Sequence, residues 1–270
     1  MNKEQEELLR QTRNTLGRLR EILAETDSAQ ADRKALADSI AQLDELFLLV
    51  VAGEFNSGKS AFINALLGEE LQEEGVTPTT DRIYWLKYGE RGEKIPAERG
   101  VWIRRAPVEL LRKISIVDTP GTNAIMREHE ALTAEFIPRS DLVLFITSAD
   151  RPFTESERNF LTQIKEWGKK IVLVVNKIDI LNSEQDVQKV IDFVSGASRQ
   201  LTGSVPVIFA VSARQAQKDA GEGGFAPLES YIQETLDDNG RFRLKLLNPL
   251  GVGNKLVNNE LAHIQADLDV

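Results

Sequence analysis

The sequence predicts an α/β fold with a mainly parallel sheet covered by helices on both faces, extended at each end by helical segments. Three observations lead to this prediction. From about residue 46, apolar runs of strand length alternate with helical segments. These runs are continuous in Val, Ile and Leu, as in parallel strands that are buried on both faces. Before and after this region the apolar residues recur with a helical period.

The N-terminal region, residues 1–45, has the composition and the period of helix. Gly17 is its only glycine, and it contains no proline. Its apolar positions recur at steps of three, four or seven residues: Leu9, Leu16, Leu19 and Leu23, then Leu36, Ile40 and Leu43. The polar residues at 26–28 predict a break into two helices, with Asp27 or Ser28 as the second N-cap.

The central region, residues 46–240, supplies the strands and helices of the α/β domain. We expect strands at Leu46–Ala52, Arg82–Tyr88, Val101–Arg104, Ile114–Val117, Leu142–Thr147, Ile171–Val175 and Val205–Val211. Helices are expected near Lys59–Leu67, Glu128–Phe136, Glu155–Trp167 and Glu184–Leu201. Thr154 with Glu157 three residues later forms a capping-box pattern, which marks the start of the third helix.

The C-terminal region, residues 241–270, is predicted to be helical and to pack beside the N-terminal segment. Pro249 and Gly251 predict a break in the chain. After it, a narrow apolar seam with 7-4-3-4 spacing predicts packing against a partner helix. The seam consists of Leu250, Val257, Leu261, Ile264 and Leu268. Because the seam reaches the last residues, we expect the chain to stop inside a longer helical structure.

The composition favours a soluble cytoplasmic protein without nucleic-acid partners. Hydrophobic residues make up 41% and charged residues 28%, which is ordinary for a globular protein. The net charge of −9 argues against general affinity for nucleic acid or anionic lipid. The chain has no cysteine, so disulfides and cysteine-ligated metals are excluded. No signal peptide is visible, and the apolar runs are too short to cross a bilayer.

The first motif is GEFNSGKS at 53–60, which matches G-x-x-x-x-G-K-[ST] between a predicted strand and a predicted helix. In this motif, backbone N–H groups turn toward phosphates at the helix N-terminus. Lys59 is expected to reach the β- and γ-phosphates and the Ser60 hydroxyl to ligate Mg²⁺. The predicted phosphate-binding residues are Glu54, Phe55, Asn56, Ser57, Gly58, Lys59, Ser60 and Ala61.

The second motif, DTPG at 118–121, follows the strand Ile114–Val117. Asp118 at that strand end is expected to provide a second contact to Mg²⁺. The Gly121 N–H can then face a γ-phosphate, which makes the segment after it sensitive to that phosphate. Between the two motifs lies GVTPTTD at 75–81, where a threonine can ligate Mg²⁺ and face the attacking water. We select Thr80, with Thr79 as the second choice.

The third motif, NKID at 176–179, identifies the nucleotide as guanine, with GTP and GDP as substrate and product. Asp179 can accept hydrogen bonds from the N1–H and N2–H₂ groups of guanine, a donor pair that adenine lacks. Asn176 is expected to tie this loop to the phosphate loop, and the stem of Lys177 to lie along the base. Ser212 and Ala213, after another strand, are expected to place a backbone N–H on the guanine O6.

In this order the motifs are those of a guanine-nucleotide switch domain, and the chain resembles the dynamin superfamily in its bacterial dynamin-like and mitofusin-like branch. The resemblance rests on GEFNSGKSAFINALLG at 53–68, VTPTTD at 76–81, VDTPGTN at 117–123, SADRPFTESE at 148–157 and RFRLKLLNPLG at 241–251. It implies a large GTPase that forms a homodimer through its GTPase domains and remodels membranes. The ends at 1–45 and 241–270 would form a helical neck, with lipid contact through regions outside this chain and peripheral membrane association.

Two positions set the expected catalytic machinery apart from that of relatives. Thr122 stands where Ras-like GTPases carry a water-orienting glutamine. Asn56 stands where dynamins commonly have a serine that helps bind a cation, so the use of a monovalent cation is open. Our hypothesis is that Thr80 positions the water while Asn56, Lys59 and Mg²⁺ neutralise the developing charge. Two alternatives are a GTP-dependent interaction switch with little hydrolysis and a ribosome-assembly GTPase with appended helices.

Overall fold

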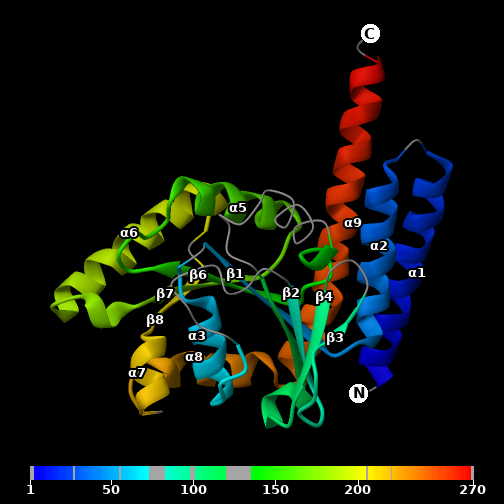
Figure 1. Cartoon of the computed structure of the whole chain (residues 1–270). Coiled ribbons are helices and arrows are strands. Elements are labelled where there is room, and N and C mark those ends of the chain that lie inside the picture. Colours follow the sequence, from blue (N-terminus) through cyan, green and yellow to red (C-terminus); the bar gives the residue numbers. More distant parts are fainter. Residues whose placement is uncertain are drawn as a thin grey trace.

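The fold, seen in a computed structural model (Figure 1), is built on an eight-stranded sheet in the order β3-β4-β2-β5-β1-β6-β7-β8. The structure describes residues 3–26, 28–54, 56–72, 83–97, 101–119, 135–204, 206–219 and 221–268. The strands are β1 Phe47–Gly53, β2 Ile83–Tyr88, β3 Ile95–Pro96, β4 Val101–Ala106, β5 Ile114–Asp118, β6 Leu142–Ser148, β7 Ile171–Asn176 and β8 Val207–Ala210. Only the β2–β5 and β3–β4 pairs are antiparallel among the strand pairs in these ranges.

The prediction of a mainly parallel sheet with helices on both faces is confirmed. All residues of β1 and β6 are buried, and alternate side chains of β1 enter different cores. Leu48 and Val50 belong to the core that includes α5 (Glu155–Glu166) and α6 (Glu184–Thr202). Leu49 and Val51 belong to the core that includes α3 (Lys59–Leu67), α7 (Ala213–Lys218) and α8 (Phe225–Thr235). The helix expected near residues 128–136 lies almost wholly outside the described residues.

The helices at the two ends of the chain pack together into what we call the helical arm: α1 (Lys3–Glu25), α2 (Gln30–Ala41) and α9 (Asp238–Leu268). In Figure 1, α9 rises alongside α2 and α1 and ends well beyond the sheet. The break between α1 and α2 is present, but the expected Ser28 cap is wrong. Ala29 is the N-cap of α2 and makes no side-chain cap bond, whereas the Ser28 hydroxyl donates to the Leu23 carbonyl at 2.5 Å. Asp27 lies outside the described residues.

The predicted break at Pro249 and Gly251 is also wrong, because α9 runs through both residues. Contacts on either side hold the helix against the α/β domain and outweigh the backbone bond that proline removes. Before Pro249, the Asn248 amide donates to the Asp141 carbonyl at 2.9 Å. After it, Gly251 passes so close to α5 that an added Cβ would lie 3.1 Å from the Trp167 carbonyl oxygen.

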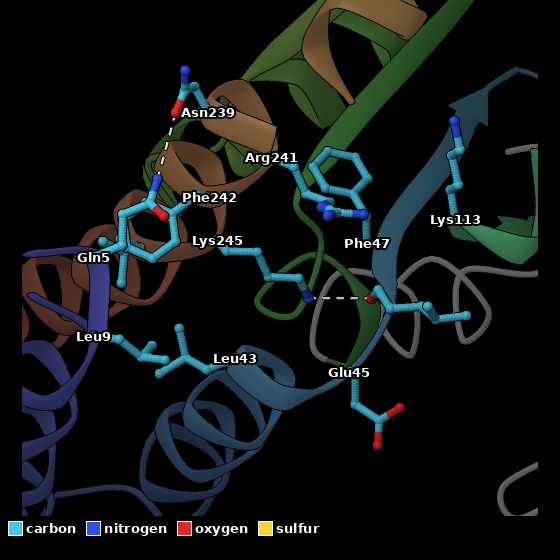
Figure 2. Close-up of a pocket in the computed structure, with 12 residues that line it drawn as sticks. Gln5, Leu9, Leu43, Glu45, Phe47, Lys113, Asn239, Arg241, Phe242 and Lys245 are labelled. Carbon is cyan, nitrogen blue, oxygen red and sulfur yellow. Dashed lines mark hydrogen bonds between the residues drawn. The ribbon is translucent and has the colours of Figure 1, made fainter. Parts of the chain in front are cut away.

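The joint between the arm and the sheet is polar and buried. In Figure 2 the Lys245 side chain reaches from α9 to the segment before β1, where it donates to the Leu46 carbonyl at 3.1 Å. It also donates to the Gln42 carbonyl at 2.7 Å and lies 2.9 Å from Asp141 Oδ2. The far half of α9 leaves its apolar seam open, since Leu261 is 59% and Leu268 76% exposed. Within the described ranges, no helix combines the length and the apolar character needed to cross a membrane.

Candidate functional site

The phosphate-loop motif connects β1 to α3, and neighbouring backbone and amide groups lie close to two of its glycines. Gly53 has φ 151°, and a Cβ there would lie 2.1 Å from the Ile146 carbonyl oxygen of β6. Gly58 has φ 83°, and a Cβ would lie 2.4 Å from the Asn176 Nδ2 atom. Only glycine fits both positions. Asn56, at φ 64°, adopts the left-handed conformation that asparagine tolerates better than most residues.

Lys59 lies under this loop, buried at the N-terminus of α3. Its Nζ atom donates to the Gly53 carbonyl at 3.0 Å and to the Glu54 carbonyl at 2.9 Å. Burial lowers the pKa of Lys59 to about 8, against the opposing effect of the acidic groups around it, Asp118 first. An ammonium group and a helix N-terminus at one place favour an anion such as a phosphate.

Asp118, at the end of β5, is fully buried, and neither of its carboxylate oxygens has a hydrogen-bond partner in the part of the chain that the structure describes. Burial raises the pKa of Asp118 to about 7, with the Lys59 charge opposing the shift. An unpaired buried carboxylate is costly unless a cation or donor meets it. Carboxylate and hydroxyl oxygens are ligands that Mg²⁺ accepts, so Asp118 and the Ser60 hydroxyl fit this ion.

Asn176 ties the NKID loop to the phosphate loop, and is buried at the end of β7. Its Nδ2 atom donates to the Ser57 carbonyl at 2.9 Å, while its Oδ1 atom accepts from the Ala213 N–H at 3.1 Å. The Ser212 hydroxyl donates to Asp179 Oδ1 at 2.6 Å. These bonds join three loops that are distant in the sequence into one unit at the carboxyl ends of parallel strands, where α/β folds bind ligands.

The Ser212–Ala213 segment differs from expectation in one respect. Both of its backbone N–H groups already have protein acceptors, the Ser212 N–H on the Gly223 carbonyl at 2.8 Å and the Ala213 N–H on Asn176 Oδ1. A guanine O6 placed here would therefore have to share the Ala213 N–H with Asn176.

The structure thus brings together most of the residues that the motifs pointed to. Those described are Glu54, Asn56, Ser57, Gly58, Lys59, Ser60, Ala61, Asp118, Asn176, Lys177, Asp179, Ser212 and Ala213. Phe55, Thr79, Thr80, Gly121 and Thr122 lie outside the described residues. The motifs missed two hydroxyls at the start of α5, those of Thr154 and Ser156, which donate to the Glu54 carboxylate. The capping box marked Thr154 only as a helix start, and the structure confirms that box.

Comparison with known proteins agrees with this geometry. The family described as 50S ribosome-binding GTPase matches residues 48–177. A probable transmembrane GTPase, FZO-like and chloroplastic, from Arabidopsis thaliana is 37% identical over 92% of this chain and 31% of its own length. An uncharacterised protein from Caldicellulosiruptor is 34% identical over 83% of this chain and 62% of its own length. The chain therefore spans less than two thirds of these relatives.

A solved structure of an oligomerised bacterial dynamin pair superposes on 98% of this chain and 48% of its own, with a TM-score of 0.63 and 18% identity. This likeness includes the helical arm as well as the sheet, because it covers nearly the whole chain. Taken with the phosphate loop, the guanine loop and the FZO-like relative, it leads to one assignment. The chain carries a GTPase domain homologous to that of the FZO-like relative, and it shares the fold of the bacterial dynamin pair.

Proposed function

We propose that this domain binds Mg²⁺–GTP through residues 53–61, Asp118, Gly121 and the loops at 176–179 and 212–213, and hydrolyses it to GDP and phosphate. The observation that carries the proposal is the burial of two residues whose charges act on each other, Asp118 and Lys59, the latter beneath a loop that Asn176 holds in place. Within the described residues, Lys59 donates only to loop carbonyls, and no hydrogen bond of normal geometry reaches the Asp118 carboxylate. A nucleotide phosphate for the first and a cation for the second would complete this pair.

For the hydrolytic step we propose that a water oxygen attacks the γ-phosphorus while the bond to the β–γ bridging oxygen breaks. The Lys59 ammonium and the Asn56 amide would donate to phosphate oxygens as negative charge develops on them. Thr80 would ligate Mg²⁺ and orient the water with its backbone. Bound Mg²⁺ would supply charge neutralisation at the β- and γ-phosphates. A Thr80→Ala variant that hydrolyses GTP at the wild-type rate would remove Thr80 from this scheme.

Guanine recognition by Asp179 has a test of its own. Asp179→Asn replaces an acceptor by an amide donor opposite the N1–H and N2–H₂ groups, so we expect GTP affinity to fall at least tenfold. Xanthosine triphosphate carries a carbonyl in place of the amino group and suits that amide better. Titration of both nucleotides into both proteins should therefore show a reversal of preference. Equal losses for the two nucleotides would show that Asp179 does not read the base.

At the level of the whole protein, we propose a homodimer through GTPase domains and a role in membrane remodelling. Support comes from the family and from the oligomerised bacterial pair that shares this fold. We also propose that residues 46–240 are the GTPase domain, that 1–45 and 241–270 belong to a neck, and that the protein is cytoplasmic and peripheral at a membrane. Light scattering should show monomer with GDP and dimer with GDP–aluminium fluoride; monomer in both states would contradict activation by dimerisation.

Two measurements distinguish the proposed function from its alternatives, a GTP switch with little hydrolysis and a ribosome-assembly GTPase. A passive GTP switch would give a rate per molecule that does not change with protein concentration, whereas dimer-activated hydrolysis rises with concentration. The matching family carries a description of binding to the 50S ribosome. For this chain of net charge −9 we expect no retention of ribosomal RNA in filter binding at moderate salt. Retention there would favour the ribosomal alternative.

A further inference from the structure

The side chain of Glu54, the first variable residue of the phosphate loop, has a role that nucleotide binding by the backbone does not explain. Its Oε1 atom accepts hydrogen bonds from the Thr154 hydroxyl, at 2.7 Å, and from the Ser156 hydroxyl. Both hydroxyls belong to the first residues of α5 or its cap, one hundred residues further along the chain. The carboxylate is therefore fixed to a helix outside the phosphate loop.

The turn that precedes these hydroxyls has a strained backbone. Phe153, the residue before Thr154, is buried in the left-handed conformation at φ 60°. A bulky residue in this conformation is strained and persists only where its surroundings determine it. The Phe153 N–H donates to the Thr147 hydroxyl at 3.1 Å, and that hydroxyl donates to the buried Glu157 carboxylate at 2.9 Å. The turn therefore presents Thr154 in one defined position.

The backbone of Glu54 connects this support to the reacting end of the site. Its carbonyl is one of the two that hold the Lys59 ammonium, and it also accepts from the Ser57 N–H at 3.2 Å and the Ser57 hydroxyl at 2.8 Å. A rotation of residue 54 would move an acceptor of Lys59 and the turn of the loop together. The two hydroxyls also keep the Glu54 negative charge directed toward α5.

We propose that Glu54 is a positioning residue for Lys59, with Thr154 and Ser156 on α5 as the fixed points of its side chain. The inference rests on the proposed function, since it deepens the assignment of Lys59 to the β- and γ-phosphates. A misplaced Lys59 weakens contacts to the phosphate that GDP lacks. Loss of Glu54 should therefore lower affinity for GTP more than for GDP and slow hydrolysis, while guanine preference over adenine stays as in the wild type.

The test uses Glu54→Ala and Glu54→Gln in the full chain, with binding of GTP and GDP, kcat and thermal unfolding measured for each. For Glu54→Ala we expect at least a tenfold loss in kcat and a GTP-to-GDP affinity ratio reduced about tenfold. Glu54→Gln keeps an acceptor oxygen and should recover most of both. An alanine variant with wild-type kcat and ratio overturns the proposal, and so does a glutamine variant as impaired as alanine.

Variants on α5 separate positioning from helix capping. Ser156→Ala removes one donor to Glu54 and the 3.3 Å contact with the Thr154 hydroxyl, but it leaves the capping box between Thr154 and Glu157. It should shift kcat in the same direction as Glu54→Ala. In the Glu54→Ala background the same change should have no further effect, because the acceptor is gone. The control for loss of a helix cap is Ser183→Ala. It removes the N-cap hydroxyl of α6, which accepts from the Asp186 N–H at 3.2 Å, and kcat should be unchanged. Additive effects of Glu54 and Ser156 overturn the proposal.

Failure of the proposed function would look different. A wild-type chain that binds neither GTP nor GDP would refute nucleotide binding itself, whatever the variants do. A wild-type chain that binds both nucleotides, with variants that keep its GTP-to-GDP ratio, would refute only the role of Glu54.

Discussion

We predict that the ion pair between Asp141 and Lys245 is a main attachment of the helical arm to the sheet, and that substitution of either residue will weaken it. Asp141 precedes β6, with its side chain 2% exposed, and Lys245 lies in α9 with 11% exposed. Asp141 Oδ2 also accepts the Leu48 N–H at 2.8 Å. Burial lowers the pKa of Lys245, and the Asp141 carboxylate opposes that shift by favouring the charged ammonium.

Asp141→Ala removes the acceptor and leaves the Lys245 ammonium among backbone carbonyls. Removing one partner of a buried pair costs about 3–5 kcal/mol, because the remaining charge is desolvated without compensation. Lys245→Met should cost a similar amount by leaving the carboxylate without its cation. The double variant Asp141→Ala with Lys245→Met should lose clearly less than the sum of the two, since neither member of this pair then remains buried without the other.

The assay is urea unfolding followed by circular dichroism, with free energies taken at a common denaturant concentration. The matched control is the pair of Lys255 and Glu166, which also joins α9 to the α/β domain at 3.0 Å but has Glu166 58% exposed. Glu166→Ala should cost less than about 1 kcal/mol. If Asp141→Ala costs no more than Glu166→Ala, or if the double variant equals the sum, the attachment does not depend on this pair.

Three further predictions concern the nucleotide site, the buried acid beneath it and the surface. Gly58→Ala should weaken GDP binding more than tenfold in calorimetric titration, because its Cβ would lie 2.4 Å from Asn176 Nδ2; Gly68→Ala, with φ 65° and nothing within 4 Å, should leave binding intact. Burial raises the pKa of Glu157 from 4.5 to about 7, so the stability that its neutral form gives is complete below pH 4.5 and is lost as the pH rises through 7. The free energy of unfolding of Glu157→Gln, relative to that of the wild type, should therefore rise by about 3 kcal/mol between pH 4.5 and pH 8. If urea unfolding shows the same difference at both pH values, this prediction is wrong. The chain alone should not sediment with liposomes of anionic lipid; robust co-sedimentation would show a lipid-binding surface within it.

The sequence was sufficient to predict the position of the loops and every strand of the sheet except the two-residue β3. The strands of the core are buried at every position, as β1 and β6 show, so their continuous apolar runs identify them without knowledge of their partners. The start of α3 at Lys59 and the start of α5 after Thr154 follow from local motifs. These features depend on residues only a few positions apart.

What could not be predicted depends on contacts between distant segments. Pro249 and Gly251 have the local character of a break, yet they lie inside α9 because Asn248 and Trp167 hold the helix there. Local propensity is a weak prior that tertiary packing overrides. The bond from Thr154 to Glu54 is of the same kind, since nothing in the spacing of one hundred residues connects a helix cap to the phosphate loop.

The two ends of β1 link the nucleotide site to the helical arm within one buried strand. At its start, Leu48 bonds to Asp141, the partner of Lys245 on α9; at its end, Gly53 and Glu54 hold Lys59. If a nucleotide is to swing the arm, it must either break the joint around Asp141 or move the arm with the sheet. Reversing a two-state equilibrium from 1:99 to 99:1 needs about 5.5 kcal/mol of differential binding. A single variant such as Asp141→Ala, which leaves one charge unpaired, destabilises the joint by about 3–5 kcal/mol, most of that amount, so it should free the arm at lower nucleotide occupancy.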